Sequence, residues 1–245
     1  MARGRRLTAA DGSHPWHTER VDLDVVRRAP LFKALDDEAS SALQAQMSRS
    51  RMERGDVLFR EGDRGDTLYV IAEGKIKIGR TSPDGRENLV AILGPGEMFG
   101  ELSLFDPGPR TATATAVTDA TVIGLGHHDL QPWLTGRPEV AAQLLGALAQ
   151  RLRRTNEAMA DLVFSDVPGR VAKALLDLAT KFGVEAEDGL RVTHDLTQEE
   201  LAQLVGASRE TVNKALADFA GRGFLRLEGR AVVILDVERL TRRAG

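Results

Sequence analysis

Two opposite charges stand near each other in the stretch FGELSLFDPGPRTATA, residues 99–114. Glu101 and Arg110 flank a Pro-Gly-Pro turn and are surrounded mainly by small and apolar residues. An ionised carboxylate only accepts hydrogen bonds, whereas a guanidinium only donates them and pairs with anions. Gly100 would let a neighbouring backbone come close. The pattern is therefore compatible with a ligand bound between the two charges, or with a local Glu101–Arg110 ion pair.

A second group of chemically useful residues lies in TQEELAQLVGASRETVNKAL, residues 197–216. Thr197 and Glu200 have the spacing of a capping box at the start of a short amphipathic helix, Gly206 ends that helix, and Ser208 caps the next one. The apolar positions of the second helix recur at helical spacing and face inward: Val212, Leu216 and Phe219. This pattern predicts a helix-turn-helix whose turn is centred on Gly206.

The outward face of that second helix suits the major groove of DNA. Arginine can donate two hydrogen bonds to guanine, and glutamate can accept one from the cytosine amino group. Hydroxyl side chains near helix starts can bind phosphate oxygens. The side chains that we expect to contact DNA are Thr197, Gln198, Ser208, Arg209, Glu210, Thr211, Asn213 and Lys214. The same pattern would also suit a three-helix packing domain with a solvated charged face.

Charge favours nucleic acid only locally. The chain carries a formal net charge of −3, and residues 165–245 hold 12 Lys and Arg against 13 Asp and Glu. Some cations nevertheless gather around the second helix and the segment GFLRLEGRAVVIL, which reads as two strands joined at Glu228-Gly229 to form a wing. These cations are Arg209, Lys214, Arg222, Arg226 and Arg230. A nucleic-acid surface must therefore come from this patch rather than from the overall charge.

A long helix is predicted over residues 138–163, with Pro138 near its start. Its seam positions recur at intervals of 3, 4, 3, 4 and 3 residues, an a/d heptad repeat that predicts a two-helix coiled coil. The seam consists of Leu145, Leu148, Leu152, Thr155, Met159 and Leu162. Because the sequence holds one helix of this type, we expect its partner to be the same helix of a second subunit; the alternative is a helix packed on its own domain. Thr155 is a polar seam residue that either fixes register or lines a ligand pocket.

The elements that must position these motifs change character along the chain. Residues 22 to about 50 read as helical, and residues 56–126 as short β-type runs punctuated by turns, which predict an antiparallel sandwich, roll or barrel. Hairpin turns are expected at Glu73-Gly74 and Asp84-Gly85. The stretch FSDVPGR, residues 164–170, interrupts the long helix, and the helix that follows is expected to stop at Gly183.

Composition excludes several classes of function. The chain has no Cys, which excludes disulfides, thiolate metal sites and Cys nucleophiles and is typical of a reducing cytosol. No apolar run approaches the roughly 20 residues of a membrane helix, and the basic, polar amino terminus is not a secretory signal, so we expect a cytoplasmic protein. His127-His128-Asp129 is interpreted as a surface turn rather than a metal cluster. No nucleophile–base arrangement can be identified, so an enzyme is not expected.

The two motifs and the order of the elements resemble the Crp/Fnr superfamily of transcription regulators, and within it the cAMP receptor proteins of the actinobacterial branch. FGELSLF…PRTA resembles the family's phosphate-binding cassette, and SRETVNKAL resembles its recognition helix. The resemblance begins near residue 22 and implies an α+β fold. Its expected parts are a flexible extension at 1–20, a cyclic-nucleotide-binding antiparallel β-roll at 21–137, a dimerisation helix and hinge at 138–164, and a winged helix-turn-helix at 165–245.

The resemblance implies that the ligand is cAMP, with no metal or redox cofactor, and it gives the cassette residues their roles. Arg110 matches the residue that pairs with the cyclic phosphate, Thr111 one that adds a hydroxyl contact, and Glu101 the acceptor of the ribose 2′-hydroxyl. The turn that meets ribose and phosphate matches Gly100, Leu102 and Ser103. Thr155 and Asn156 match positions at which the dimer helix reaches the adenine, and Thr followed by Asn agrees with the actinobacterial pattern.

The implied function is that of a cAMP-responsive homodimer that binds palindromic operators with TGTGA half-sites. Arg209 and Glu210 would be the main base readers and Lys214 a supporting one, and RNA polymerase is expected as a further partner. Two alternatives stay open: a regulator of the same family that binds DNA without cAMP or responds to another ligand, and an enzyme that acts on nucleotides. The absence of Cys argues against an iron–sulfur sensor, while Glu101 and Arg110 together favour a cyclic nucleotide.

Overall fold

The computed structural model describes residues 25, 29–32, 35–82, 84–105 and 108–245 of the 245-residue chain. Contacts divide the chain into two compact units, one of Met1–Arg86 with Val90–Arg151 and one of Glu87–Leu89 with Leu152–Gly245. The expected extension at 1–20 lies outside the described residues. The family-based division into four parts stays a prediction.

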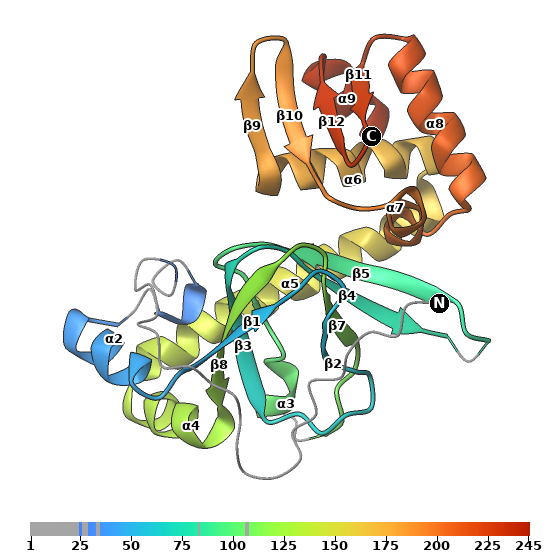
Figure 1. The fold of residues 1–245 in the computed structure, drawn as a ribbon. Coiled ribbons are helices and arrows are strands. Elements are labelled where there is room, and N and C mark those ends of the chain that lie inside the picture. The colour runs from blue at the N-terminus through green and yellow to red at the C-terminus, as the bar shows by residue number, and fades with distance from the viewer. Residues whose placement is uncertain (1–24, 26–28, 33–34, 83, 106–107) are drawn as a thin grey trace. The chain divides into compact units, whose positions relative to one another are not determined.

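The first unit consists of a β-roll and short helices, together with the first half of a long helix (Figure 1). Its helices are η1 (Pro30–Phe32), α2 (Asp37–Gln44), α3 (Leu102–Phe105), α4 (His127–Gly136) and the start of α5 (Pro138–Phe164). Its strands are β1 (Ser48–Met52), β2 (Val57–Phe59), β3 (Thr67–Glu73), β4 (Ile76–Thr81), β5 (Glu87–Leu93), β6 (Met98–Phe99), β7 (Thr113–Ala116) and β8 (Ala120–Gly126). The division by contacts counts the first three residues of β5, Glu87–Leu89, with the second unit, and we describe the strand here with its sheet.

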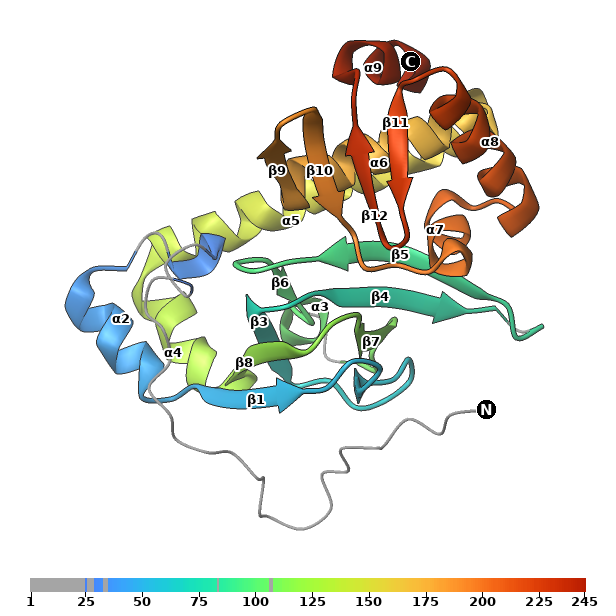
Figure 2. The ribbon, with the colours of Figure 1, turned by 45° about the horizontal axis from the view of Figure 1, so that its top comes forward.

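The strands of the first unit form two four-stranded sheets, with the orders β1-β8-β3-β6 and β2-β7-β4-β5 (Figure 2). Apolar side chains from both sheets pack together between them: Met52, Ile71, Ile76, Leu93, Phe99, Ala114, Ala116, Ala120 and Val122. The alternate residues of β3 and β8 point the other way, where they meet Leu43 of α2, Leu130 of α4 and Val140 of α5. The sheet β1-β8-β3-β6 is therefore buried on both faces, which explains why β8 is apolar at almost every position.

Three local expectations for this unit meet different outcomes. β1 begins at Ser48, inside the segment that was expected to be helical to about residue 50. The turn at Glu73-Gly74 is not a hairpin, because β3 and β4 belong to different sheets and Gly74 (φ 80°) carries the chain from one to the other. The expected hairpin at Asp84-Gly85 is confirmed, since β4 and β5 are neighbours in one sheet and Gly85 has a φ of 83°.

The second unit contains the end of α5 and a sheet-and-helix domain. Its further helices are α6 (Val167–Phe182), α7 (Gln198–Val205), α8 (Arg209–Gly221) and α9 (Val237–Ala244). Its strands are β9 (Gly183–Ala186), β10 (Gly189–Thr193), β11 (Leu225–Glu228) and β12 (Ala231–Ile234), in the sheet order β11-β12-β10-β9. Helix α6 lies at the centre of this unit, because α7, α8, α9 and β10 all pack against it. The α+β fold class is confirmed.

The caps of the predicted helix-turn-helix are present as the sequence indicated. The Thr197 hydroxyl accepts from the Glu200 N–H while the Glu200 carboxylate accepts from the Thr197 N–H, which is a complete capping box. Gly206 ends α7 in the left-handed conformation, with a φ of 68°, and Ser208 caps α8. Val212, Leu216 and Phe219 are buried as expected. β11 and β12 form the wing.

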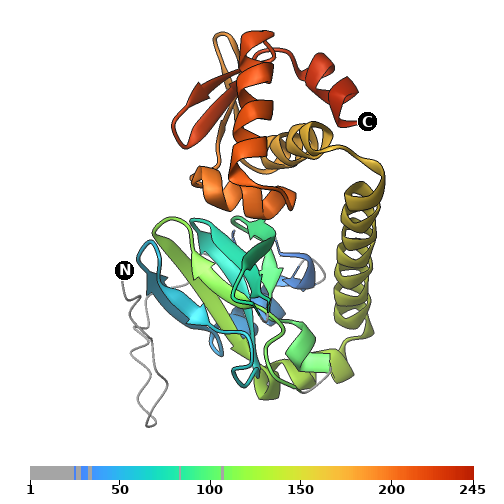
Figure 3. The same cartoon turned by 90° about the vertical axis from the view of Figure 1, so that its right-hand side faces the viewer.

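The long helix α5 is continuous over 27 residues and ends at Phe164 (Figure 3). Asp166 begins α6, because its carboxylate accepts a hydrogen bond from the Gly169 N–H. The expected interruption between the two helices and the expected end of α6 at Gly183 are both confirmed. Within the described ranges, none of the helices combines the length and apolar character that crossing a membrane requires.

Candidate ligand site and nucleic-acid interface

Arg110 is buried inside the β-roll, with only 5% of its surface exposed. Its Nη1 donates to the Gly100 carbonyl at 3.0 Å and its Nη2 donates to the Thr67 carbonyl at 2.8 Å. Its guanidinium also stacks on Phe59, with Cζ 4.2 Å from the ring centroid. Two backbone carbonyls and an aromatic ring therefore fix the orientation of this cation, and none of the carboxylates in the described part of the chain pairs with it.

The electrostatics of Arg110 leave it charged but incompletely bonded. Burial lowers the pKa of its guanidinium, and the neighbouring Tyr69, Asp66 and Glu101 act in the opposite direction. Arginine still stays protonated at neutral pH because its ordinary pKa is so high. Its Nε is buried and has no hydrogen-bond partner in the described ranges of the chain. A buried N–H of a charged group without an acceptor is costly, so this atom is available for an anionic ligand.

Glu101 is equally buried, with 3% of its surface exposed. Its Oε1 forms an ion pair with Arg151 of α5, whereas its Oε2 is buried and finds no hydrogen-bond partner among the residues that the structure describes. Among the ion pairs of the described residues there is none between Glu101 and Arg110, so the local ion pair left open by the sequence is not formed. No sequence signal marks Arg151, because it stands among other arginines of a helix where each reads as solvated.

Gly100 is the residue that allows Glu101 and Arg110 to occupy their positions. Its φ is +80°, and a Cβ added to it would lie 2.8 Å from Arg110 Nη1 and 2.9 Å from the Thr67 carbonyl oxygen. A larger residue would therefore both strain the backbone and displace the guanidinium. Of the other expected cassette residues, Leu102 and Thr111 are exposed. Ser103 belongs to α3, and its side chain is not among those that the structure describes.

The expected seam of α5 consists mostly of exposed side chains. Leu145, Leu152, Met159 and Leu162 expose 57–65% of their surface, and Leu148 is half-buried. Thr155 and Asn156 are also exposed. A run of apolar side chains at heptad spacing that stays in contact with water is unusual for a helix packed on its own domain.

The exposed face of α8 carries most of the side chains that were expected to read DNA. Arg209 is exposed, and its side chain makes no hydrogen bond or ion pair within the part of the chain that the structure describes. Glu210 and Lys214 are also exposed and pair with each other at 2.9 Å. Asn213 was expected to point outward, and this is wrong: it is half-buried, and its Oδ1 is buried without a partner.

The hydroxyls expected to bind phosphate are engaged in helix caps. The Thr197 hydroxyl also donates to the Glu200 carboxylate at 3.0 Å, and the Ser208 and Thr211 hydroxyls are 2.9 Å apart. All three are exposed, and Gln198 is exposed beside Thr197 at the first position of α7. These hydroxyls would have to exchange an internal bond for a phosphate oxygen.

The cations around the wing differ in how far their charge is already neutralised. Arg226 forms ion pairs with Asp188 and with Glu228, the latter at 3.0 Å, and these carboxylates raise the pKa of its guanidinium. Arg222 pairs with Asp218 at 2.9 Å. Arg230, next to the wing turn, is exposed and has no ion-pair partner among the residues described.

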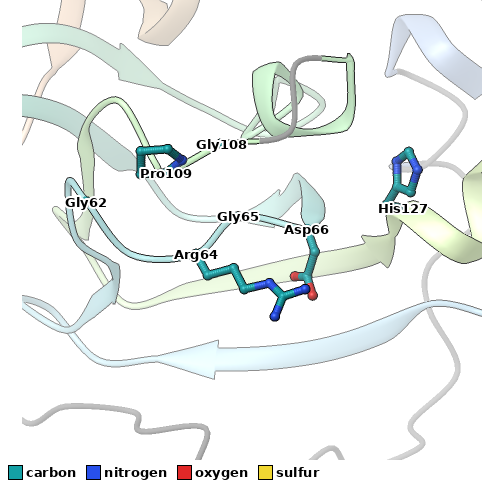
Figure 4. A pocket seen from close by; sticks show the side chains of 7 residues that line it. All are labelled: Gly62, Arg64, Gly65, Asp66, Gly108, Pro109 and His127. Atoms are coloured by element: carbon teal, nitrogen blue, oxygen red, sulfur yellow. The ribbon is translucent and has the colours of Figure 1, made fainter.

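A surface hollow of about 540 Å³ lies elsewhere on the first unit, lined by Gly62, Arg64, Gly65, Asp66, Gly108, Pro109 and His127 (Figure 4). It includes neither Glu101 nor Arg110. The interpretation of 127–129 as a surface turn is wrong, because His127 begins α4. The described residues contain no group of three or more His, Asp or Glu side chains that could hold a metal ion.

The fold and the two sites together define a DNA-binding protein with a separate domain for a small phosphorylated ligand. Comparison with family models agrees: the cyclic nucleotide-binding domain matches residues 49–135, and the Crp-like helix-turn-helix domain matches residues 169–243. The chain belongs to the Crp/Fnr family of transcription regulators.

Relatives across the whole length support this family. The CRP-like cAMP-activated global transcriptional regulator of Mycobacterium tuberculosis is 58% identical over 221 residues, which are 90% of this chain and 99% of the relative. The cyclic AMP receptor protein of Thermus thermophilus is 38% identical and is covered to 96%, against 88% of this chain. A solved CRP-family regulator from Thermus thermophilus superposes with a TM-score of 0.69 at 31% identity, over 80% of this chain and 96% of that one. These relatives are regulators rather than enzymes, and the expected actinobacterial branch is confirmed.

Proposed function

We propose that this protein is a cAMP-responsive transcription regulator that acts as a homodimer on palindromic operators with TGTGA half-sites. The observation that carries the proposal is a pair of buried atoms, Glu101 Oε2 and Arg110 Nε, that have no hydrogen-bond partner among the described residues. The carboxylate oxygen suits a ribose 2′-hydroxyl, and the guanidinium N–H suits an oxygen of a cyclic phosphate. One ribose 3′,5′-cyclic phosphate presents both groups, so it would satisfy both atoms at once.

The residues proposed to hold the nucleotide come from the cassette and from α5. They are Gly100, Glu101, Leu102, Ser103, Arg110, Thr111, Thr155 and Asn156. Arg151 supports them indirectly, because its ion pair with Glu101 Oε1 leaves Oε2 free to accept a hydrogen bond. Thr155 lies four residues after Arg151 on the same continuous helix, and residues at this spacing share a helix face. This supports a role for Thr155 beside the adenine.

The seam of α5 is proposed to pair with the same helix of a second subunit. Exposed apolar residues at heptad spacing support this, because a coiled coil would remove Leu145, Leu152, Met159 and Leu162 from water. Leu148 and Thr155 complete the seam. RNA polymerase is a proposed further partner. We place the protein in the cytoplasm, where bacterial DNA lies, because DNA is its proposed partner.

The exposed face of α8 is proposed to enter the major groove. Arg209 and Glu210 would contact base edges, with Lys214 in support, after the Glu210–Lys214 pair opens. Thr197, Gln198, Ser208 and Thr211 would contact phosphates. Asn213 keeps only a marginal role, because half of its side chain is covered. Two-fold symmetry then predicts half-sites whose centres are about 10 base pairs apart.

The nucleotide is proposed to act by shifting a population. A dimer with two arrangements of its DNA-binding units responds to any ligand that binds one arrangement better than the other. A ligand that contacts both the β-roll and α5 satisfies this condition, since α5 runs from the first unit into the second.

The test is fluorescence anisotropy of a labelled TGTGA-N6-TCACA duplex, titrated with protein at fixed salt, with and without cAMP. The expected result is an affinity that rises clearly with cAMP and that a scrambled duplex of the same composition does not reproduce. Specific binding that does not change with cAMP would leave a DNA reader of this family but contradict the cAMP response. Turnover of cAMP by the purified protein would contradict the assignment as a regulator alone.

A further inference from the structure

We propose that Arg170, on the first turn of α6, is a positioning residue that ties the end of α5 to the turn of the helix-turn-helix. The inference deepens the proposed function and rests on it. It assigns to one side chain the coupling between the position of the end of α5 and the position of α8. Arg170 has no role in the motifs read from the sequence, and it is not among the side chains that were expected to bind the nucleotide or to contact DNA.

The Arg170 guanidinium donates hydrogen bonds to three backbone carbonyls from two distant parts of the chain. Its Nη1 donates to the Ser165 carbonyl at 2.8 Å, just beyond the end of α5. Its Nε donates to the Val205 carbonyl at 3.0 Å, and its Nη2 donates to the Gly206 carbonyl at 3.3 Å. The guanidinium thus joins the interruption between α5 and α6 to the turn that separates α7 from α8.

The chemistry of the acceptors explains why the joint is an arginine. The last carbonyls of a helix have no partner within the helix, and they carry the negative end of its dipole. Val205 and Gly206 stand at the end of α7, and Ser165 follows the end of α5. A cation between them therefore donates hydrogen bonds to carbonyls at both helix ends and compensates their partial negative charge. Three acceptors in different directions need the planar fork of a guanidinium, whereas a lysine ammonium is a single point charge on a flexible stem.

Side-chain packing reinforces the same junction. Gly206 lies against α5, because a Cβ added to it would come within 3.2 Å of Leu162 Cδ2. Only Ala207 separates Gly206 from Ser208, the cap of α8. A displacement of the end of α5 would therefore move the start of α8 or break the bonds of Arg170.

Two ion pairs hold the other side of the hinge. Lys173 of α6 pairs with Asp161 of α5 at 2.5 Å, and this contact raises the pKa of the lysine. Asp166 pairs with Arg243 of α9 at 2.6 Å. These contacts link α5, α6 and α9, but neither reaches the turn of the helix-turn-helix. Among the hinge contacts just described, the hydrogen bonds of Arg170 reach the turn between α7 and α8.

The experiment compares Arg170→Gln and Arg170→Lys with the wild type and with a matched control, Arg239→Gln. Arg239 is an exposed arginine of α9, in the same unit, that pairs with Asp236 at 3.1 Å. For each full-length protein, operator affinity is measured by anisotropy with and without cAMP, cAMP affinity by calorimetry, and folding by thermal unfolding. The readout is the ratio of the two operator affinities, because a merely structural role would weaken both affinities alike.

The expected wild-type ratio is about 5–150, the ordinary range of allosteric coupling. Arg170→Gln is expected to bring the ratio below about 2, and Arg170→Lys is expected to lower it at least about threefold, with cAMP affinity changed less than about twofold in both variants. The ratio of Arg239→Gln should equal that of the wild type. Should Arg170→Gln fail to fold, Arg170→Lys and Gly206→Ala carry the test. Gly206→Ala disturbs the same junction from the other side and is expected to lower the ratio too.

Three outcomes would overturn the inference. A ratio preserved in the Arg170 variants, with normal folding, would show that the coupling does not pass through this side chain. Equal losses with and without cAMP would reduce Arg170 to a structural role. A wild-type ratio of one would contradict the proposed cAMP response itself and leave no coupling for Arg170 to carry, which distinguishes failure of the function from failure of the residue assignment.

Discussion

The arginines proposed to meet ligands in the two units are held in opposite ways. Arg110 is buried, stacked on Phe59 and bonded to two carbonyls, with one N–H left without a partner. Arg209 is exposed at the start of α8 and, among the described residues, unbonded. One side chain is fixed before any ligand arrives, whereas the other must be ordered by its ligand.

The contrast follows from what each site must recognise. A small ligand with one phosphate offers few contacts, so its site benefits from a cation whose orientation is fixed in advance. A DNA duplex offers many phosphates and base edges, so long, free side chains can adjust to the groove while the summed charge provides affinity. Preorganisation therefore belongs to the β-roll and adaptability to the winged helix-turn-helix.

The largest expected effect comes from breaking the fixed arginine. Arg110→Leu removes the cation proposed to face the phosphate, and loss of one partner of a buried charge pair costs about 2 kcal/mol or more. We expect cAMP binding to weaken about 30-fold or more, measured by titration calorimetry, while the protein stays a folded dimer. The matched control is Arg80→Leu, which changes an exposed arginine paired with Glu61 in the same unit. Undiminished cAMP binding in Arg110→Leu would contradict the assignment of the phosphate contact.

An intermediate effect is expected from the free arginine of α8. Arg209→Ala should cost about 1–3 kcal/mol on the best operator and relax the base preference at one position, because it removes the proposed contact with a base edge. Anisotropy with single-base variants of the duplex measures both changes. Arg226→Ala is the control: its charge already meets Asp188 and Glu228, so operator affinity should fall less than for Arg209→Ala. A loss that is equal on every sequence would make Arg209 a phosphate contact only.

The smallest expected effect is a pH-dependent change in the free energy of unfolding when Asp166, at the hinge, is replaced. The Arg243 guanidinium, followed by the Gly169 N–H, lowers the pKa of Asp166 below its usual 3.8. A carboxyl with a lowered folded-state pKa stabilises the fold above its unfolded pKa, and this contribution is lost as pH falls through the folded value. We expect Asp166→Asn to lower the free energy of urea unfolding by less than about 1 kcal/mol at pH 6 and to have no effect near pH 2. A difference that does not narrow at low pH would contradict the ionic role of Asp166.

The sequence predicted most reliably those features that depend on neighbouring residues. The capping box at Thr197 and Glu200, the left-handed Gly206 and the Ser208 cap are all set within a few positions of the chain, and all are confirmed. The interruption before α6 is equally local, because Asp166 caps the helix with its own side chain. Helix boundaries of this kind carry their signal in residue types alone.

Features that arise from the tertiary fold were missed or misread. The turn after β3 looks like a hairpin turn locally, but the chain passes there into the other sheet. The pairing of Glu101 with Arg151 joins residues 50 positions apart, and no periodicity marks it. Asn213 was placed outward by helical spacing, yet its Oδ1 is buried. The roles of Arg170 and Arg226 likewise depend on contacts between distant segments.

The close approach at Gly100 has a practical consequence for libraries of variants. Its φ is positive, and a Cβ at this position would lie only 2.8 Å from Arg110 Nη1, so there is no room for a side chain. Leu102, two residues later, is exposed to solvent. In a saturation library selected for response to the nucleotide, position 100 should return glycine almost alone and position 102 a broad spectrum. Redesign of the receptor for another ligand would therefore begin at the exposed positions around the cassette, with the glycine kept.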